Sequence, residues 1–419
     1  MKVLKNKRLL VLGGSIWKEA IKQFAEDYDV TIIAAGLYHA GIFDIADECY
    51  YIDTINSEIM KGFIKEKNID GVYMGGSELI ISNACKYINE LGLPCYCTID
   101  QWNYLQNKEK FKELCIVHDI PVVPKYTLES TNIDYPVITK PVDGCGSSGF
   151  SVCNNREELI KGYNLARDNS TSGNVIIEKF VKNDGVVVFY TFSNGKLHFS
   201  GLEDKYPVRY EKEGSYVGGL FVFESSLTNK FRTEYETKIE KMFSSIGIKE
   251  GTVWIEIFND NGNFYFNEVG FRYGGSASIF PIDYLYKINQ VYSDIYYALT
   301  GESCIEWDKS IIKDNIQKCS RYAVYPIHMN AGTIESFKGH EILLTDNRIV
   351  AMPIIKSVGQ EIKQTGSFSQ AVALVHFVFN TDNECIDIIN HIHNTFKVID
   401  NKGHNLVHKM LNTENLILR

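Results

Sequence analysis

The chain lacks most of the features that mark a zinc-binding, membrane-spanning or nucleic-acid-binding protein. Its ten cysteines form no Cys-x-x-Cys pair and no cluster with histidine, so we expect the reduced thiols of a cytosolic protein rather than a disulfide framework. No apolar run is long enough to span a bilayer. A net charge of -9 argues against a general nucleic-acid binder, which needs clustered lysine and arginine.

Two common nucleotide-binding signatures are also missing. Gly13-Gly14-Ser15 follows an apolar run but does not have the G-x-G-x-x-G spacing of a dinucleotide site. The glycine- and serine-rich segment 144–149 does not place Lys-Ser or Lys-Thr after its second glycine, as a P-loop would. The basic residues at the start precede only a short apolar run, which we interpret as a core strand and not as a signal peptide.

The 419 residues suggest two to four domains. In the first hundred residues, short apolar runs alternate with helical patterns, which predicts a parallel sheet with helices on both faces. Ligands bind such sheets at the carboxyl ends of the strands, where Gly13–Ser15 and Gly75–Glu78 lie. The predicted strands are 8–12, 30–35, 49–52, 71–74 and 94–97, and the predicted helices are 17–28, 57–67 and 80–91.

The most informative stretch runs from Gly251 to Ser276. Two runs rich in β-branched and aromatic residues flank the turn Asn259–Gly262, which predicts a β-hairpin. One arm carries Glu256, the other carries Glu268, and Arg272 follows. Paired carboxylates suit a Mg²⁺ shared with phosphate oxygens, and an arginine suits a developing phosphate or carboxylate charge. The alternative is an edge hairpin with solvated acids.

Further polar residues lie between these two regions. The predicted helix 107–118 has its apolar positions on one face, so Lys110 and Lys112 are expected on a solvated face. The apolar strand 135–141 ends in Lys140, although lysine is seldom buried without a partner. The segment 144–149 that follows can wrap a polyphosphate with backbone N–H groups and hydroxyls, or it is only a hairpin tip.

The rest of the chain reads as further strands and helices. Residues 203–219 have no clear periodicity and are interpreted as pocket lining or a mobile cover. From Cys319 onward, short strands and turns predict a C-terminal α+β domain. The predicted strands are 174–181, 186–192, 322–325, 342–344, 349–355 and 372–379, and the predicted helices are 155–168, 228–246, 284–299 and 383–396.

With these motifs in this order, the chain resembles the ATP-grasp ligases. It is most similar to the carboxylate–amine (L-amino acid) ligases and more distantly similar to biotin carboxylase and carbamoyl-phosphate synthetase. The resemblance implies an α/β and α+β architecture: a doubly wound parallel-sheet domain at 1–103, an ATP-grasp domain at 104–312 with a lid at about 121–190, and a small α+β domain at 313–419. It also implies ATP and Mg²⁺, which Mn²⁺ could replace, a cytoplasmic location and a homodimer.

The resemblance assigns roles residue by residue. Lys108 and Lys140 correspond to the two phosphate-binding lysines, and Glu256 and Glu268 to the two magnesium-binding acids. Arg272 corresponds to the arginine that holds the transferred phosphoryl group, so Arg272 and Lys140 are the expected catalytic residues. The nucleotide-binding set also contains the residues of the glycine-rich flap and of the adenine and ribose segment, which are Gly144, Gly146, Ser147, Ser148, Gly149, Glu178, Lys179, Phe180 and Asp184.

One position departs from the family pattern. The asparagine two residues after the second acid is Gly270 here, so water or Asn267 has to complete the metal shell, or catalysis is weakened. Further candidates for substrate contacts are Ser77, Glu78, Arg209, Tyr216 and Arg321.

The expected function is an ATP-dependent ligase that joins a small carboxylate, expected to be an amino acid, to an amine through an acyl phosphate and releases ADP and phosphate. The first alternative is a bicarbonate-using carboxylase or carbamoyl-phosphate-type enzyme, which the lack of a Met-Lys-Met biotin-carrier signature disfavours. The second is a nucleotide-binding protein that has lost turnover.

Overall fold

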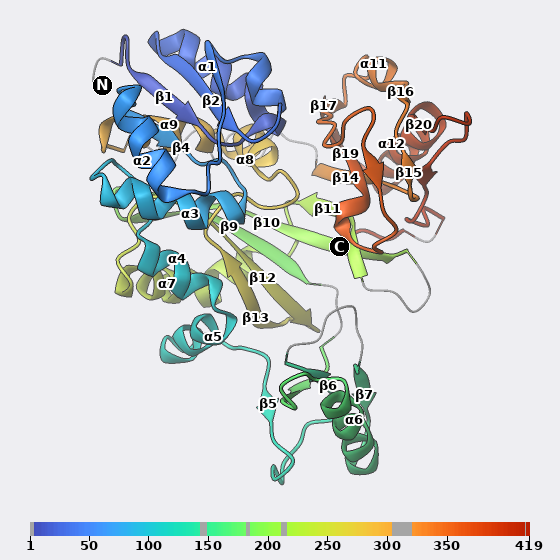
Figure 1. The fold of residues 1–419 in the computed structure, drawn as a ribbon. Coiled ribbons are helices and arrows are strands. Elements are labelled where there is room, and N and C mark those ends of the chain that lie inside the picture. Colours follow the sequence, from blue (N-terminus) through green and yellow to red (C-terminus); the bar gives the residue numbers. More distant parts are fainter. Residues whose placement is uncertain (1–3, 143–148, 182–184, 211–215, 304–320, 415) are drawn as a thin grey trace.

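The structure of the protein is a computed structural model that describes residues 4–142, 149–181, 185–210, 216–303, 321–414 and 416–419. Figure 1 shows an N-terminal lobe, a C-terminal lobe and a small lobe arranged around one central sheet. Within these ranges, no helix combines the length and apolar character needed to cross a membrane. Every cysteine that the structure describes is a free thiol, as expected from the sequence.

The N-terminal lobe contains a parallel sheet with strand order β3-β2-β1-β4. Alternate side chains of β1 point to opposite faces, where Leu9 packs with Phe24 of α1 and Leu10 packs with Met60 of α2. Helices therefore cover both faces, as the alternating pattern predicted. The elements are β1 (Arg8–Val11), α1 (Lys18–Tyr28), β2 (Thr31–Gly36), β3 (Glu48–Tyr51), α2 (Ser57–Glu66), β4 (Gly71–Tyr73) and α3 (Glu78–Glu90), with short 3₁₀ turns η1 (Ser15–Trp17) and η2 (Gly41–Asp44).

The predicted strand at 94–97 is wrong. These residues form a bend that leads into α4 (Ile99–Gln106), whose first turn is closed by a capping box between Thr98 and Gln101. The apolar alternation that suggested a strand has another cause, because Tyr96 packs on Phe271 with ring centroids 5.1 Å apart. The residues are thus held by the loop that follows the acidic hairpin.

Nine strands form the central sheet in the described part of the chain. On one face Val186, Val188 and Tyr190 of β9 pack under α7 (Thr228–Ser245) and α5 (Lys108–Val117), and the opposite face carries the candidate site. In spatial order the strands are β13 (Asn263–Gly270), β12 (Gly251–Asp260), β9 (Val186–Ser193), β10 (Lys196–Arg209), β11 (Tyr216–Phe223), β14 (Arg321–Met329), β19 (Ala371–Phe379) and β17 (Ile349–Ala351), with β21 (Val407–His408) beside β14.

The small lobe is a four-stranded antiparallel sheet packed against one helix. It projects from the central sheet at the bottom of Figure 1, below α5. Its core consists of Val137, Cys153, Leu159 and Ile177. The elements are β5 (Lys125–Tyr126), β6 (Val137–Pro141), β7 (Ser151–Cys153), α6 (Arg156–Asp168) and β8 (Val175–Lys179).

The single helix predicted at 284–299 is wrong, because two helices occupy this stretch: α8 (Ile279–Tyr286) and α9 (Gln290–Thr300). Lys287 has a φ of 56°, which ends α8 in a left-handed conformation. The side chain of Asn289 then caps α9 by accepting a hydrogen bond from the amide of Tyr292 at 3.0 Å. The break lets α9 turn back against the N-terminal lobe.

The C-terminal lobe builds on the far strands of the same sheet and is covered by α12 (Asp382–Thr395). The strand predicted at 342–344 is wrong, since His340–Leu343 form the short helix α11. The remaining elements are the strand pairs β15 (Gly332–Thr333) with β18 (Glu361–Ile362) and β16 (Ser336–Lys338) with β20 (Lys397–Ile399), and the 3₁₀ turn η3 (Phe368–Gln370). We retain the domain limits given above as a proposal.

Candidate active site

The two acids of the predicted hairpin lie side by side. Strands β12 and β13 pair in antiparallel register with Glu256 directly opposite Glu268, so both side chains leave the same face of the sheet. The register shifts just after this pair, where β13 has one extra residue. That residue is Asn267, whose side-chain amide donates a hydrogen bond of 2.8 Å to Glu256. The bulge therefore brings an amide to the acid pair.

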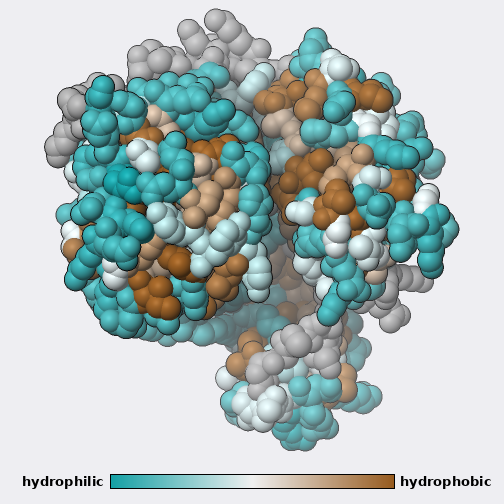
Figure 2. Space-filling model, turned by 45° about the horizontal axis from the view of Figure 1, so that its top comes forward, coloured by the Kyte–Doolittle hydropathy of each residue, from teal (hydrophilic) through white to brown (hydrophobic). Residues whose placement is uncertain are grey.

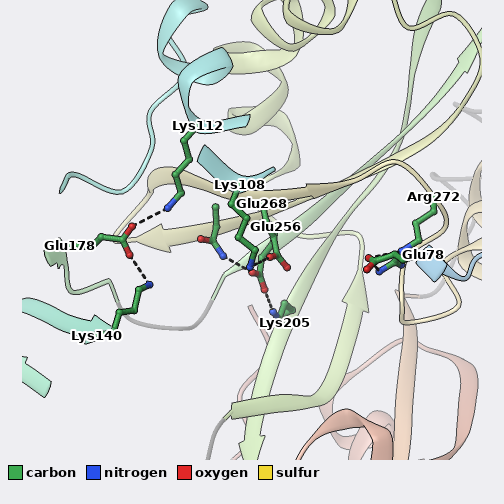
Figure 3. A network of polar contacts seen from close by, with 10 residues as sticks. Glu78, Lys108, Lys112, Lys140, Glu178, Lys205, Glu256, Glu268 and Arg272 are labelled. Atoms are coloured by element: carbon green, nitrogen blue, oxygen red, sulfur yellow. Dashed lines mark hydrogen bonds and ion pairs between the residues drawn. The ribbon is translucent and has the colours of Figure 1, made fainter. Parts of the chain in front are cut away.

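Two lysines from other elements contact this acid pair (Figure 3). Lys108, the first residue of α5, forms an ion pair with Glu268, and Lys205 of β10 forms one with Glu256. Burial alone would raise the pKa of Glu256, but Lys205 outweighs it and holds that pKa below its ordinary value. Burial likewise opposes the charge of Lys108, yet Glu268 keeps the pKa of that ammonium raised. Glu256 and Lys108 are therefore both charged at neutral pH.

Lys205 was not singled out in the sequence. It lies in residues 203–219, of which the structure describes 203–210 and 216–219. Residues 203–209 are the end of β10 and 216–219 the start of β11, and several of them line the large cavity described below, which agrees with the expected pocket lining. Glu203 and Lys205 face the site while Leu202 faces the core under α7, so both faces of this strand are largely buried. The usual alternation of apolar and polar residues is lost, and only the two-residue spacing of Glu203 and Lys205 carries a signal.

A second charged cluster joins α5 to the small lobe. Glu178 of β8 is 5% exposed and accepts hydrogen bonds from Lys112 at 3.0 Å and from Lys140 at 2.8 Å. Burial raises the pKa of Glu178, but the two ammonium groups outweigh it and hold that pKa below its ordinary value. The expectation that Lys112 is solvated is wrong, because its side chain is only 10% exposed. A tertiary partner, which helical spacing does not reveal, explains its burial.

Replacing Lys112 by methionine is expected to lower the free energy of unfolding by about 1–3 kcal/mol at pH 7, because Glu178 keeps one half-exposed cation. Glu178 has a lowered pKa, so its ion pairs add stability above the ordinary value of 4.5 and lose it as the pH falls through the folded pKa. Urea unfolding should therefore show a gap between variant and wild type at pH 7 that closes below pH 4.5. The exposed neighbour Lys110, changed to methionine, should give almost no gap at either pH.

The other predicted nucleotide contacts are placed in part. Gly144, Gly146, Ser147, Ser148 and Asp184 lie outside the described residues. Gly149 has a φ of 72°, and a Cβ there would come within 2.9 Å of Pro141. Lys179 forms an ion pair with Asp134, and Phe180 is 38% exposed.

The backbone of this segment is already engaged. The amide of Lys179 donates to the carbonyl of Pro124 and that of Phe180 to the carbonyl of Pro136, both at 2.9 Å. An adenine held here would have to use other groups of the segment.

Arg272 closes the other end of the row of charged groups in Figure 3. Its guanidinium donates to Glu78 of α3 at 2.6 and 3.0 Å and to the carbonyl of Tyr273 at 2.8 Å. Tyr273 is fixed in turn, since its hydroxyl is bonded to Asp294 of α9 and lies 3.3 Å from the hydroxyl of Tyr73. The loop that carries Arg272 is thereby attached to the N-terminal lobe.

A cavity of about 590 Å³ opens on the face of the sheet that carries the acid pair. Arg272 lies in its wall together with Glu256 and Glu268, and Thr365–Phe368 contribute the side nearest the C-terminal lobe. Figure 2 shows the hollow that runs between the N-terminal and C-terminal lobes.

The remaining substrate candidates fall on both sides of this cavity. Tyr216 lines it, and the guanidinium of Arg209 stacks on the Tyr216 ring at 3.7 Å. Ser77 lines a second cavity of about 380 Å³ that lies between Gly13–Trp17 and Arg272–Gly275. Arg321 instead contacts Asp382 and the carbonyl of Arg419 in the C-terminal lobe. The segment Arg272–Gly275 is therefore a wall that the two cavities share.

Gly270, the departure from the family pattern, lies directly opposite Trp254. A Cβ at position 270 would come within 2.3 Å of the Trp254 indole, so any larger residue there collides with the ring. The same ring lies 5.2 Å from the guanidinium of Arg272. Trp254 thus occupies the space of the missing side chain and supports Arg272.

The donor set suits magnesium shared with a nucleotide. Among the described residues no group of three or more histidine, cysteine, aspartate or glutamate side chains could enclose a metal ion. Glu256 and Glu268 can supply carboxylate oxygens from one face, and Mg²⁺ commonly takes one or two carboxylates and completes its shell with phosphate oxygens and water. Lys108 and Lys205, which form ion pairs with these acids, are cations of the kind that bind phosphate oxygens.

Comparison with known proteins identifies the class that this fold and site define. Residues 133–279 match the sequence profile of the ATP-grasp domain, so the chain contains an ATP-grasp domain. A biotin carboxylase domain of Hydrogenobacter thermophilus, whose solved structure has a TM-score of 0.71 to this fold at 19% identity, is in complex with MgADP and bicarbonate. The predictions of an ATP-grasp protein and of a mixed α/β fold of that type are confirmed.

The particular relatives differ in their reactions. A formate-dependent phosphoribosylglycinamide formyltransferase of Prochlorococcus marinus is 27% identical over 191 residues, which is 42% of this chain and 48% of that protein. The chain spans about half or less of the length of the curated relatives it matches first.

Two solved structures show the likeness of the whole fold. A phosphoribosylglycinamide synthetase of Anaerococcus prevotii has a TM-score of 0.74 at 17% identity and covers 94% of this chain and 100% of that one. An L-amino acid ligase of Bacillus licheniformis has a TM-score of 0.69 at 19% identity and covers 94% of this chain and 99% of that one.

Proposed function

We propose that the chain is a cytoplasmic ATP-dependent carboxylate–amine ligase that forms an amide through an acyl phosphate. The observation that carries the proposal is the acid pair Glu256 and Glu268, flanked by lysines from α5 and β10, at the edge of a cavity that Arg272 also lines. The cavity of about 590 Å³ has room for an organic carboxylate. The likeness to an L-amino acid ligase supports the same reading.

The chemistry needs positioned charge more than a covalent protein group. A carboxylate oxygen of the donor forms a bond to the γ-phosphorus of ATP, the bond to the β,γ-bridging oxygen breaks, and ADP leaves. The amine nitrogen then bonds to the acyl carbon, the acyl C–O bond breaks, and the departing phosphate takes the proton that the nitrogen loses. Bound Mg²⁺ would neutralise charge on the phosphates while Glu256 and Glu268 hold it.

The residues of this chain have separate tasks in that scheme. Lys108 comes from α5 on the central sheet and Lys140 from β6 of the small lobe, so they would bind the phosphates from two sides, as expected of the catalytic Lys140. Arg272 would stabilise the charge on the transferred phosphoryl group and the acyl phosphate. Its support by Tyr273 and Trp254 keeps it in place without rearrangement. A homodimer, as in some relatives, belongs to the same proposal.

The proposal is tested by measuring ADP release from MgATP with pooled amino acids, with bicarbonate, and with neither. Stimulation by amino acids, with an amide product seen by mass spectrometry, is the expected result. Stimulation by bicarbonate alone would replace the proposal with a carboxylase or carbamoyl-phosphate-type reaction. Tight ATP binding without ADP in any mixture would indicate a nucleotide-binding protein without turnover, in line with the altered position Gly270.

A further inference from the structure

One buried acid lines the large cavity without a cation of its own. Glu203 of β10 is 1% exposed, and its carboxylate accepts a hydrogen bond of 3.2 Å from the hydroxyl of Ser276. Lys205, the next residue on the same face of β10, forms its ion pair with Glu256 instead. In the part of the chain that the structure describes, no lysine or arginine forms an ion pair with Glu203.

The burial of Glu203 makes the lack of a charged partner energetically unfavourable for its ionised form. Burial raises its pKa to about 8, although Ser276 and Lys205 both oppose the shift. A carboxyl group with little access to water and without a charged partner is normally avoided, because its charge is stabilised only by a partner. A cation on a ligand in the cavity would supply the missing partner.

The walls next to Glu203 are apolar. Val187 and Phe189 of β9 and Phe221 of β11 are all less than 9% exposed and line the cavity on the neighbouring strands. Trp254 of β12 and Phe368 of the C-terminal lobe line it as well. The cavity thus combines an anionic end at the acid pair, a single unpaired acid at Glu203, and aromatic walls.

We propose that Glu203 binds the protonated amine of the acyl donor and thereby selects carboxylates that carry an amino group and an apolar side chain. This inference rests on the proposed ligase function. The carboxylate of the donor must approach the phosphate near Glu256, Glu268 and Arg272, and these residues line the same cavity as Glu203. The second cavity, on the other side of Arg272–Gly275, would leave a separate space for the acceptor amine.

The test uses pairs of probes that differ only in the amino group: L-phenylalanine with 3-phenylpropionate, and L-leucine with 4-methylpentanoate. Binding to the full chain is measured by calorimetry in the presence of MgADP. Wild type is expected to bind at least one amino acid about 10- to 100-fold more tightly than its partner without the amine. Glu203→Gln should weaken the binding of that amino acid by the same factor and leave the binding of the acid without the amine unchanged.

Glu203→Gln is expected to fold. Between pH 4.5 and about 8, the Glu203 carboxyl is protonated in the folded chain but ionised in the unfolded chain. The contribution of Glu203 to the free energy of unfolding therefore falls as the pH rises through that window. Glutamine keeps the shape and an oxygen for Ser276 and removes this loss. Glu203→Asp, which keeps the carboxyl group, is a second variant and should retain part of the preference for the amine.

The matched control is Glu224→Gln. The pKa of Glu224 is also raised to about 8 by burial, but its carboxylate is bonded to Thr228 and Tyr286 and is not part of the cavity wall. This variant should keep the full preference for the amine.

Two results would overturn the inference: a preference that persists in Glu203→Gln, or a wild type that binds neither amino acid better than its partner. ADP release separates the two proposals. If the preference and its loss in Glu203→Gln are seen but no amine-bearing acid stimulates ADP release, Glu203 recognises the amine and the ligase proposal fails. If ADP release is stimulated equally by acids with and without the amine, the ligase proposal stands and the role of Glu203 fails.

Discussion

Replacing Glu268 by glutamine is expected to lower the rate of ADP formation by about 10²–10³-fold and to raise the Mg²⁺ concentration needed for half-maximal rate. Glutamine has the size of glutamate but no charge, so Glu256 alone would have to hold the ion against the nucleotide. The ion pair of Lys108 with Glu268 would be lost as well. Initial rates measured over a range of Mg²⁺ concentrations at saturating ATP give both quantities.

The control for this variant lies on the same hairpin. Asp260, the last residue of β12, is an acid at the far end of the strand, where its carboxylate accepts a local hydrogen bond from Asn261. Asp260→Asn should therefore keep the rate and the Mg²⁺ dependence of wild type. If Glu268→Gln forms ADP at the wild-type rate, the acid pair does not hold the metal ion.

The acidic hairpin could be predicted because its information is local. The turn Asn259–Gly262 and the β-rich arms fix two antiparallel strands, and two carboxylates that interrupt them in register then share a face. The extra residue Asn267 could not be foreseen, since a bulge depends on how β13 packs and not on its own sequence. Its amide contact to Glu256 is consistent with one of the two replacements considered for the missing asparagine.

The charged partners from other elements were harder to foresee. Lys205 was not singled out from the sequence and Lys112 was predicted to be solvated, because each lysine is paired with an acid far away in the sequence. Helical and strand periodicity report which face of an element is apolar, but not which acid arrives from another lobe. Lys108 and Lys140 were identified through the family resemblance, which carries tertiary information that a single sequence does not.

The predictions of the single helix at 284–299 and of the strand at 94–97 were wrong for a different reason. The apolar pattern of α8 and α9 continues through Lys287, whose left-handed conformation separates the two helices. Nothing but the cap residue Asn289 marks the break, and one cap residue competes poorly with sixteen residues of pattern. At Cys95 and Tyr96, burial against the Arg272 loop imitates the alternation of a strand.

Replacing Gly270 by asparagine is expected to lower the free energy of unfolding by about 1–3 kcal/mol or more, although asparagine is the residue of the family pattern. The new Cβ would lie 2.3 Å from the Trp254 indole, which cannot move without disturbing its contact with Arg272. In a chain that already carries Trp254→Ala, the same change should cost less than about 0.5 kcal/mol, because the space is open. Urea unfolding of the four proteins measures the coupling.

Gly275→Asn serves as the matched control, since a Cβ at that glycine meets open space in the same loop region. Its effect on unfolding should be small in both backgrounds. Equal losses for Gly270→Asn with and without Trp254 would show that the ring does not fill the place of the asparagine side chain. The expected coupling would instead show that the Trp254 ring fills the space that an asparagine side chain at position 270 needs.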